Sequence, residues 1–276
     1  YSRLRPLKPA TKRTYTYMLE ARIFPVFGGR RLDCVTPSML LEFRSQLVAE
    51  GVSAATANRH VTLIRMVLNE AWQRGVIPAN PVPAGSVKPL KEAPPVVAYF
   101  SEEERDAFLA AFDDEAGFRA DIEARREQGP VVSSRAAVVP RRCGGGRRGD
   151  SEATGRAFKR FASAGPYFLC ALDTGLSRLD LINLRWESVD LDAGLIRIIR
   201  EKTQVQVSIP ITSRMMAVLR GLGPVKSGEP VFATPEGRHW SETTLKRYFK
   251  VAKRIAGIDR RFRFHDLRHD FASSLA

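Results

Sequence analysis

The stretch Thr174-Gly175-Leu176-Ser177-Arg178-Leu179-Asp180-Leu181 stands before two runs of alternating apolar and polar residues. The runs are Leu195-Ile196-Arg197-Ile198 and Val205-Gln206-Val207-Ser208-Ile209. Alternation at a period of two is typical of half-buried strands, so these runs predict an antiparallel pair. Helical spacing flanks the pair, and we expect helices over residues 179–186, 212–222, 242–256 and 264–275. The fold class predicted for the chain is therefore mainly α with a small antiparallel β-sheet.

Residues 1–82 are predicted to form a separate domain of helices. An apolar stripe over residues 15–23 has helical spacing and ends before Pro25 and two glycines. Thr36 and Ser53 can cap two further helices, because their side-chain oxygens can accept from the free amides of a first helical turn. The side of the last helix that shows Asn58, Arg59 and Arg65 is expected to be exposed and basic.

Residues 83–98 are rich in proline, which favours a linker, and residues 99–276 would then form the second domain. Ser101 and Glu104 have the spacing of a capping box at the start of a helix. Residues 113–160 contain a glycine- and arginine-rich run and few large apolar residues, so we expect a mobile insertion there. This insertion is either a basic loop that touches nucleic acid or a solvated surface segment.

The composition indicates the class of partner. The 276 residues include 44 Lys and Arg against 30 Asp and Glu, a formal net charge of +14, and the isoelectric point is near 10.2. This excess attracts polyanions, and nucleic acid is the commonest such partner. No apolar run is long enough to span a membrane, and no secretion signal opens the chain. Three widely spaced cysteines are typical of a reducing compartment, so we expect a cytoplasmic protein.

The strongest local motif for chemistry is His265-Asp266-Leu267-Arg268-His269. On a helix, His265 and Arg268 lie three residues apart and share a face. An arginine fork can hold the oxygens of a phosphate, while a histidine can donate a hydrogen bond or move a proton. Taken alone, the same pair is also compatible with a surface salt bridge or a helix cap.

Several boxes in order resemble the tyrosine recombinases, the phage integrase family. In the second half they are the stretch from Thr174, Glu201-Lys202-Thr203 between the two strands, and the box at His265. In the first half, segments that include Lys8-Pro9-Ala10-Thr11, Phe24-Pro25-Val26-Phe27-Gly28 and Thr56-Ala57-Asn58-Arg59 resemble the family's helical core-binding domain. The resemblance covers about residues 1–112 and 165–276 and implies a SAM-like core-binding domain followed by an α+β integrase-type catalytic domain.

The resemblance implies an enzyme that cuts and rejoins duplex DNA through a covalent phosphotyrosine, without a metal or another cofactor. Fixed cations must then neutralise the charge that develops on the phosphate. By the resemblance, Arg268 and His265 flank the scissile phosphate and Lys202 protonates the leaving 5′-oxygen as a general acid. Asp180 matches an acidic position that supports the arginine and the histidine. Without the neighbouring motifs that resemble the family, Lys202 would be interpreted as an ordinary lysine in a hairpin.

Two departures from the family pattern concern the catalytic set. The family places an arginine directly after Thr-Gly-Leu, but Ser177 stands there and Arg178 follows. One residue along a helix rotates a side chain by about 100°, so either the turn is rearranged to bring Arg178 into the site or the site is weakened. The second departure is that all six tyrosines precede the box at His265. The family's nucleophile follows that box, and we expect it beyond Ala276. The chain is then expected to be cut at both ends and to be inactive without this tyrosine.

Candidate contacts to DNA backbone phosphates lie in both domains. They are Lys8, Lys12, Arg13, Arg59 and Arg65 in the first domain and Lys246, Arg247 and Lys250 in the second. Tyr248 is interpreted as a packing residue. The family also implies a homotetramer on paired DNA sites and a role in a phage or another mobile genetic element.

Two other functions are also considered from the sequence. One is a DNA-binding relative or fragment without catalysis, because Ser177 and the missing tyrosine would abolish chemistry and leave the basic surfaces. The other is a metal-dependent transposase, which needs converging carboxylates, and no such spacing is evident.

Overall fold

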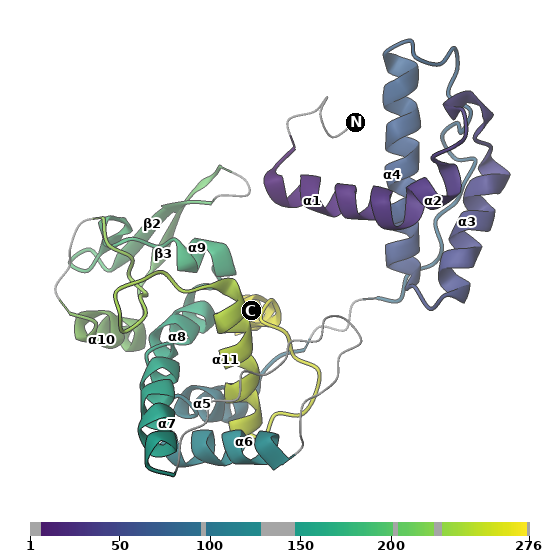
Figure 1. Cartoon of the computed structure of the whole chain (residues 1–276). Coiled ribbons are helices and arrows are strands. Elements are labelled where there is room, and N and C mark those ends of the chain that lie inside the picture. The colour runs from purple at the N-terminus through teal and green to yellow at the C-terminus, as the bar shows by residue number, and fades with distance from the viewer. Residues whose placement is uncertain (1–6, 95–97, 128–146, 201–203, 224–227, 275–276) are drawn as a thin grey trace. The chain divides into compact units, whose positions relative to one another are not determined.

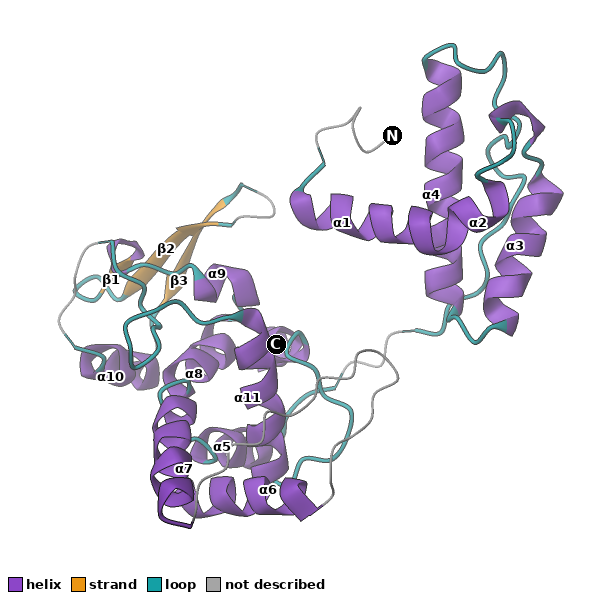
Figure 2. Ribbon diagram, viewed as in Figure 1, coloured by secondary structure: helices purple, strands orange, loops and turns teal. Residues whose placement is uncertain are grey.

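The computed structural model describes residues 7–94, 98–127, 147–200, 204–223 and 228–274. The chain divides into two compact units, Tyr1–Pro95 and Val96–Ala276 (Figure 1). Each unit has a hydrophobic core of its own. Helices make up most of both units, and the sheet belongs to the second one (Figure 2). The predicted fold class, mainly α with a small antiparallel sheet, is confirmed.

The first unit is built from helices whose starts are fixed by side-chain caps. Thr36 accepts from the amide of Met39, and Ser53 accepts from the amide of Thr56, so both predicted caps are confirmed. In chain order the elements are α1 (Pro9–Met18), the π-helical turn η1 (Leu19–Ile23), α2 (Phe24–Phe27), the 3-10 turn η2 (Leu32–Cys34), α3 (Pro37–Ala49) and α4 (Ala54–Gln73).

The sequence predicts that the first helix ends before Pro25, and this prediction is wrong. Pro25 lies in the first turn of α2. A proline has no amide hydrogen to donate and its ring crowds the carbonyl one turn back. The wide π-helical turn η1 stands directly before it, where Phe24 donates to the carbonyl of Leu19. The helical path therefore runs on to Phe27, and the chain turns at the glycines that follow.

The core of the first unit forms between α3 and α4. Leu40 and Leu47 of α3 and Leu63 and Leu68 of α4 are fully buried or nearly so. Val87 is buried in the same core, although it belongs to the stretch 83–98 that the sequence marks as a linker. At least its beginning is therefore packed on the first unit.

Asn58 fixes this packing and corrects one prediction. Its side-chain amide donates to the carbonyl of Leu90 at 3.0 Å and to the carboxylate of Glu92 at 2.8 Å, and its oxygen accepts from the amide of Leu90 at 2.9 Å. The prediction of an exposed Asn58 is wrong, because the chain folds back over this part of α4 and pairs all the hydrogen-bonding groups of the side chain.

The second unit packs its helices around a cluster of aromatic rings. Phe108 and Phe168 are fully buried, with ring centroids 5.7 Å apart. The predicted capping box of Ser101 and Glu104 is present. The helices are α5 (Glu102–Ala110), α6 (Glu115–Glu127), α7 (Arg147–Ala162), α8 (Gly165–Thr174), α9 (Arg178–Ile182), α10 (Ser213–Gly221), α11 (Glu242–Ile255) and α12 (Asp266–Ser274).

The segment 113–160, which the sequence predicts to be a mobile insertion, is mostly helical wherever the structure describes it. Residues 128–146 lie outside the described residues, but α6 and α7 occupy most of the rest. Phe118 of α6 and Phe161 of α7 are buried with ring centroids 4.9 Å apart, and Phe158 packs beside them. Phe118 on α6 and the pair Phe158 and Phe161 on α7 anchor both helices, although the segment as a whole is polar.

The sheet has the strand order β1-β2-β3 with antiparallel neighbours, and its strands are β1 (Val189–Asp190), β2 (Leu195–Ile199) and β3 (Gln206–Pro210) (Figure 2). Ile196 pairs with Ile209 and both side chains are buried, which confirms the predicted strand pair. The helix predicted over 179–186 is shorter, because α9 ends at Ile182 and the 3-10 turn η3 (Trp186–Ser188) follows. The carbonyl of Leu184 accepts from Val231 instead of continuing the helix.

Among the helices that the structure describes, none combines the length and the apolar character needed to cross a lipid bilayer.

Candidate functional site

His265 stands in the turn that leads into α12, and Arg268 lies in the first turn of that helix. The turn is held by Asp266, a buried residue whose carboxylate accepts from the backbone amide of Arg263 at 2.8 Å and from its guanidinium at 3.0 Å. Burial alone would raise the pKa of Asp266, but these hydrogen bonds lower it below its ordinary value. The carboxylate is therefore charged at neutral pH and fixes the turn from Arg263 to Asp266, which contains His265.

The guanidinium of Arg268 carries no hydrogen bond or ion pair within the described part of the chain, and its residue is half-buried. Nearby arginines are engaged: Arg263 pairs with Asp266, and Arg105 pairs with Asp270. A half-buried guanidinium with free donors is well suited to hold an anion from outside, because its fork matches the oxygens of a phosphate.

His265 is exposed and its ring meets the ring of His269 edge-on, with centroids 5.1 Å apart. Partial burial lowers the pKa of His265 below its ordinary value, and the positive charges of His269 and Arg268 lower it further. At neutral pH the imidazole is then mostly neutral, with one nitrogen that donates and one that accepts. The charge of Arg268 thus acts on His265, and together the two residues offer a cation and a proton-transfer group.

The turn that follows α8 lies against α12. Gly175 ends α8 with a φ of +56°, and a Cβ atom there would come within 2.5 Å of the Phe271 ring on α12. Thr174 donates to the carbonyl of Cys170 at 2.6 Å and accepts from the amide of Leu176 at 3.3 Å. The absence of a side chain at position 175 allows this close approach. The Thr-Gly-Leu-Ser turn and the helix that carries Arg268 are therefore in direct contact.

Ser177 begins α9 as its N-cap, with its hydroxyl accepting from the amide of Asp180 at 3.2 Å. Arg178, the first residue of the helix, donates from Nη2 to Oε2 of Glu242 at 2.7 Å, and its guanidinium lies over the ring of Phe264 at 5.7 Å from the centroid. The side chain of Arg178 is thus engaged by α11 and by the residue before His265. Its role at a phosphate stays a prediction.

Asp180 faces a different feature, a hollow of about 660 Å³ between α9 and the β2–β3 hairpin. No hydrogen bond or ion pair among the described residues joins the Asp180 carboxylate to Arg178, His265 or Arg268. Ile199 and Gln204 line this hollow, and Lys202 lies outside the described residues. The other residues that line it are Asn183, Leu184, Ser188, Arg197, Ile198 and Gln206.

Two residues near this site have no signal in the sequence. Glu242 binds Arg178 across 64 positions in the chain, and Phe264 supplies the ring beneath its guanidinium. The sequence marks Glu242 only as the first residue of a helix capped by Ser241. Sequence spacing alone gives no indication that these two side chains contact Arg178.

The predicted phosphate contacts of the second unit lie on the exposed face of α11. Lys246, Arg247 and Lys250 are exposed, whereas Leu245, Tyr248, Phe249, Val251 and Ala252 on the same helix are buried. Tyr248 is 5% exposed, which confirms its interpretation as a packing residue. Lys246 lies 3.6 Å from Glu242, and Arg247 lies 5.3 Å from the ring centroid of Tyr248. Lys250 has no ion pair within the described residues.

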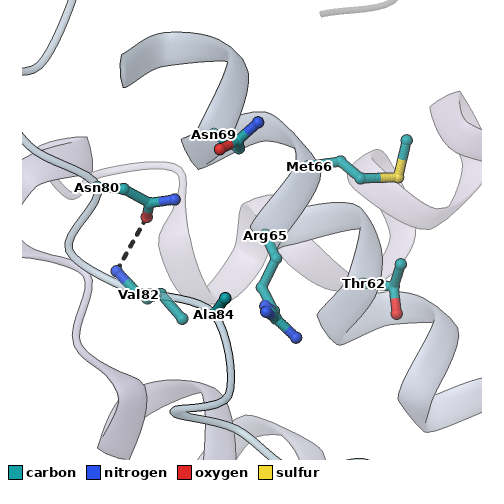
Figure 3. A pocket seen from close by; sticks show the side chains of 7 residues that line it. All are labelled: Thr62, Arg65, Met66, Asn69, Asn80, Val82 and Ala84. Atoms are coloured by element: carbon teal, nitrogen blue, oxygen red, sulfur yellow. Dashed lines mark hydrogen bonds between the residues drawn. The ribbon is translucent and has the colours of Figure 1, made fainter. Parts of the chain in front are cut away.

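In the first unit, Lys8, Lys12, Arg13 and Arg59 are exposed, and Arg65 is half-buried. Arg65 lines a hollow of about 300 Å³ between α4 and the loop after it, together with Thr62, Met66, Asn69, Asn80, Val82 and Ala84 (Figure 3). The loop wall is fixed by Asn80, whose side-chain oxygen accepts from the amide of Val82 at 3.0 Å. Arg65 makes no ion pair among the described residues, so its donors are free for an anion in the hollow.

The family models that match the chain cover most of it. The model of the phage integrase family matches residues 156–276, and the model of the phage integrase SAM-like domain matches residues 4–88. Among curated proteins, tyrosine recombinase XerC of Xylella fastidiosa strain M23 is 31% identical over 105 residues, and XerC of strain 9a5c is 32% identical over 105 residues. Each match covers 37% of this chain and 35% of the relative, so it spans about a third of the relative's length.

Solved structures share the fold at low sequence identity. A lambda integrase dimer bound to a COC′ core site has a TM-score of 0.66 at 20% identity, covering 99% of this chain and 86% of that one. A lambda integrase tetramer bound to a Holliday junction has a TM-score of 0.67 at 19% identity, covering 99% and 70%. A Tn1549 transposon integrase in complex with a circular intermediate DNA has a TM-score of 0.69 at 15% identity, covering 98% and 82%.

Proposed function

The chain belongs to the phage integrase family, the tyrosine recombinases, and on this premise we propose that it binds duplex DNA and breaks and rejoins strands at specific sites. The observation that carries the proposal is the free, half-buried guanidinium of Arg268 beside the imidazole of His265. A phosphodiester under attack gathers negative charge on its non-bridging oxygens, and a fixed cation next to a proton-transfer group stabilises that charge.

The proposed reaction needs no energy source other than the DNA bond itself. A tyrosine hydroxyl attacks the phosphorus, a tyrosyl–phosphate bond forms, and the bond from phosphorus to the 5′-oxygen breaks. The proton lost by the tyrosine passes to a base, and the leaving 5′-oxygen takes a proton and becomes a free hydroxyl. Attack by a 5′-hydroxyl on the phosphotyrosine reverses these steps and rejoins a strand.

Each site residue has a role in this proposal. Arg268 binds the non-bridging oxygens, and His265 donates a hydrogen bond to them or shuttles the proton. Lys202 is the proposed general acid for the 5′-oxygen, and Asp180 is the proposed support of the charged set. Ser177 supplies no positive charge at the position where the family has an arginine, and Arg178 beside it is bound to Glu242.

The basic side chains of both units are proposed to bind the sugar-phosphate backbone. Such contacts position a duplex, and each one releases counterions on binding. We further propose that several copies assemble on paired DNA sites, since related integrases are seen as dimers and tetramers on DNA.

The decisive experiment compares Arg268→Ala with a matched variant, Arg261→Ala, in the full-length gene product. Arg261 is exposed and precedes the same turn, so both variants lose one positive charge in the same region. The substrate is a nicked duplex that traps the covalent intermediate, and the readout is the protein–DNA adduct. We expect Arg268→Ala to lose about 10²–10³ in rate, while Arg261→Ala keeps the normal rate.

Binding is measured in parallel by titrating a fluorescent duplex at several salt concentrations. A steep fall of affinity with salt is expected for both variants and for the unmodified protein. Normal adduct formation by Arg268→Ala would contradict the assignment of the site. Salt-sensitive binding without any adduct in the unmodified protein would reduce the function to DNA binding.

A further inference from the structure

Arg178 joins three segments that are distant in the sequence. It begins α9, its guanidinium donates to Glu242 in the first turn of α11 at 2.7 Å, and it lies over the ring of Phe264, the residue before His265. Its backbone is held as well, because the hydroxyl of Tyr167 donates to the carbonyl of Arg178 at 3.2 Å. Arg178 is therefore fixed at both its backbone and its side chain.

The guanidinium of Arg178 already has a partner of opposite charge inside the unit. Glu242 accepts from Arg178 and lies 3.6 Å from the ammonium of Lys246, so one carboxylate serves two cations. A guanidinium bound to a carboxylate is a weaker partner for a phosphate than a free one, because the carboxylate competes for its donors and cancels its field. This ion pair distinguishes Arg178 from Arg268, whose donors are free among the described residues.

Phe264 connects this arrangement to the catalytic pair. Its ring packs against Tyr167 at 5.9 Å and against Phe168 and Phe249 at 6.0 Å each, and Arg178 covers it. The carbonyl of Phe264 accepts from Leu267, and the carbonyl of His265 accepts from Arg268. A ring enclosed in this way leaves the backbone at His265 little freedom, so the position of the ring sets the start of α12.

From these contacts we propose that Arg178 is a positioning residue, which with Glu242 clamps Phe264 and so holds His265 and Arg268 in register for the phosphate. Arg178 does not supply the cation that is missing at Ser177. The inference rests on the proposed function, because it assigns a role in the same reaction.

The variant Glu242→Gln separates this role from the alternative. It keeps the shape of the side chain and removes the charge that holds Arg178. If Arg178 positions Phe264, the loss of its ion pair with Glu242 loosens the turn at His265. The rate of adduct formation then falls by about 10- to 100-fold, as expected for a small misplacement of reacting groups. If Arg178 supplied a cation to the phosphate, removal of the competing carboxylate would raise the rate. A rate that is unchanged or raised therefore overturns the proposal.

Two further variants test the clamp from its other sides. Phe264→Leu removes the ring under the guanidinium, and Arg178→Lys keeps the charge but loses the planar group that covers the ring. Both are expected to lower the rate at saturating DNA by about as much as Glu242→Gln, with DNA affinity within a factor of about two. The matched control is Arg185→Gln, since Arg185 lies just beyond α9 and donates to the carbonyl of Gly228, away from Phe264.

A measurement without DNA keeps the inference independent of the proposed reaction. The histidine ring resonances of isotope-labelled protein are compared in the unmodified protein, Glu242→Gln and Arg185→Gln. We expect the His265 and His269 signals to shift or broaden only in Glu242→Gln, while the signal of His239, the other histidine of the second unit, stays in place and reports an intact fold. Unchanged His265 signals in folded Glu242→Gln would overturn the positioning role. Absence of adducts from every protein, with the His265 shift present, would instead refute the proposed function alone.

Discussion

The buried carboxylate of Asp270 on α12 accepts from the guanidinium of Arg105 on α5 at 2.9 Å, across 165 positions in the chain. The other oxygen of Asp270 accepts from the backbone amide of Phe100 at 3.0 Å. The first helix of the second unit and the helix that carries Arg268 are thus joined by one carboxylate. Both oxygens of the Asp270 carboxylate are occupied by donors of the same chain, so the role of this ion pair is to hold α5 and α12 together.

Asp270→Ala is expected to destabilise the second unit by about 3–5 kcal/mol, because it leaves Arg105 partly buried without its partner. The measurement is urea unfolding followed by the fluorescence of Trp186 and Trp240, which are buried in this unit. The control is Glu115→Ala, which breaks an exposed pair with Arg119 and should cost at most about 1 kcal/mol. Equal losses in the two variants would contradict the burial argument.

Gly175→Ala is expected to separate α8 from α12. The alanine must adopt a positive φ and must also push its Cβ against the Phe271 ring. Gly194→Ala is the matched control, since Gly194 has a φ of +65° and nothing lies within 4 Å of its Cβ position. We expect the control to lose about 1–2 kcal/mol from backbone strain alone and Gly175→Ala to lose more. Comparable unfolding midpoints would mean that Phe271 moves aside freely.

The depressed pKa of His265 predicts the direction of a pH effect on stability. The unfolded chain takes up a proton at His265 near the ordinary value of 6.5, and the folded chain does so only at lower pH. Between these two pKa values the unfolded state binds more protons, so the free energy of unfolding falls as the pH drops below 6.5. Urea midpoints near pH 7.5 and about pH 5.5 should therefore differ less in His265→Gln than in the unmodified protein. An equally large difference in His265→Gln and in the unmodified protein would contradict this assignment.

Arg65 in the first unit and Lys250 in the second are each expected to contact one DNA phosphate. Replacing Arg65 or Lys250 by glutamine is expected to lower the slope of log affinity against log salt by about 0.9. Arg31→Gln is the control, because Arg31 already pairs with Asp33 at 2.6 Å. Equal slopes for all the variants would remove Arg65 and Lys250 from the proposed DNA contacts.

The sequence was sufficient where structure depends on near neighbours. The caps at Thr36, Ser53 and Ser101 follow from side chains that bind amides three residues on, and the strand pair follows from alternation. The family model for residues 156–276 likewise matches a region that contains the box at His265. These features need only spacing along the chain.

The sequence was insufficient to predict features that depend on contacts between residues far apart in the chain. Helices α6 and α7 depend on Phe118 and Phe161, which meet each other only in the folded core. The direction of Arg178 depends on Glu242 and Phe264, and no local pattern connects them. Proline rules predicted a break at Pro25, but a π-helical turn one residue wider than an α-turn removes the conflict.

Ser177 gives α9 its first hydrogen-bonded turn. An arginine installed there would add a cation and at the same time take away the cap, a loss of about 1 kcal/mol at the start of a helix only five residues long. A variant with arginine at position 177 would therefore need a compensating change to anchor this short helix. One side chain cannot both begin α9 and reach out to DNA, and in this chain position 177 is committed to the helix.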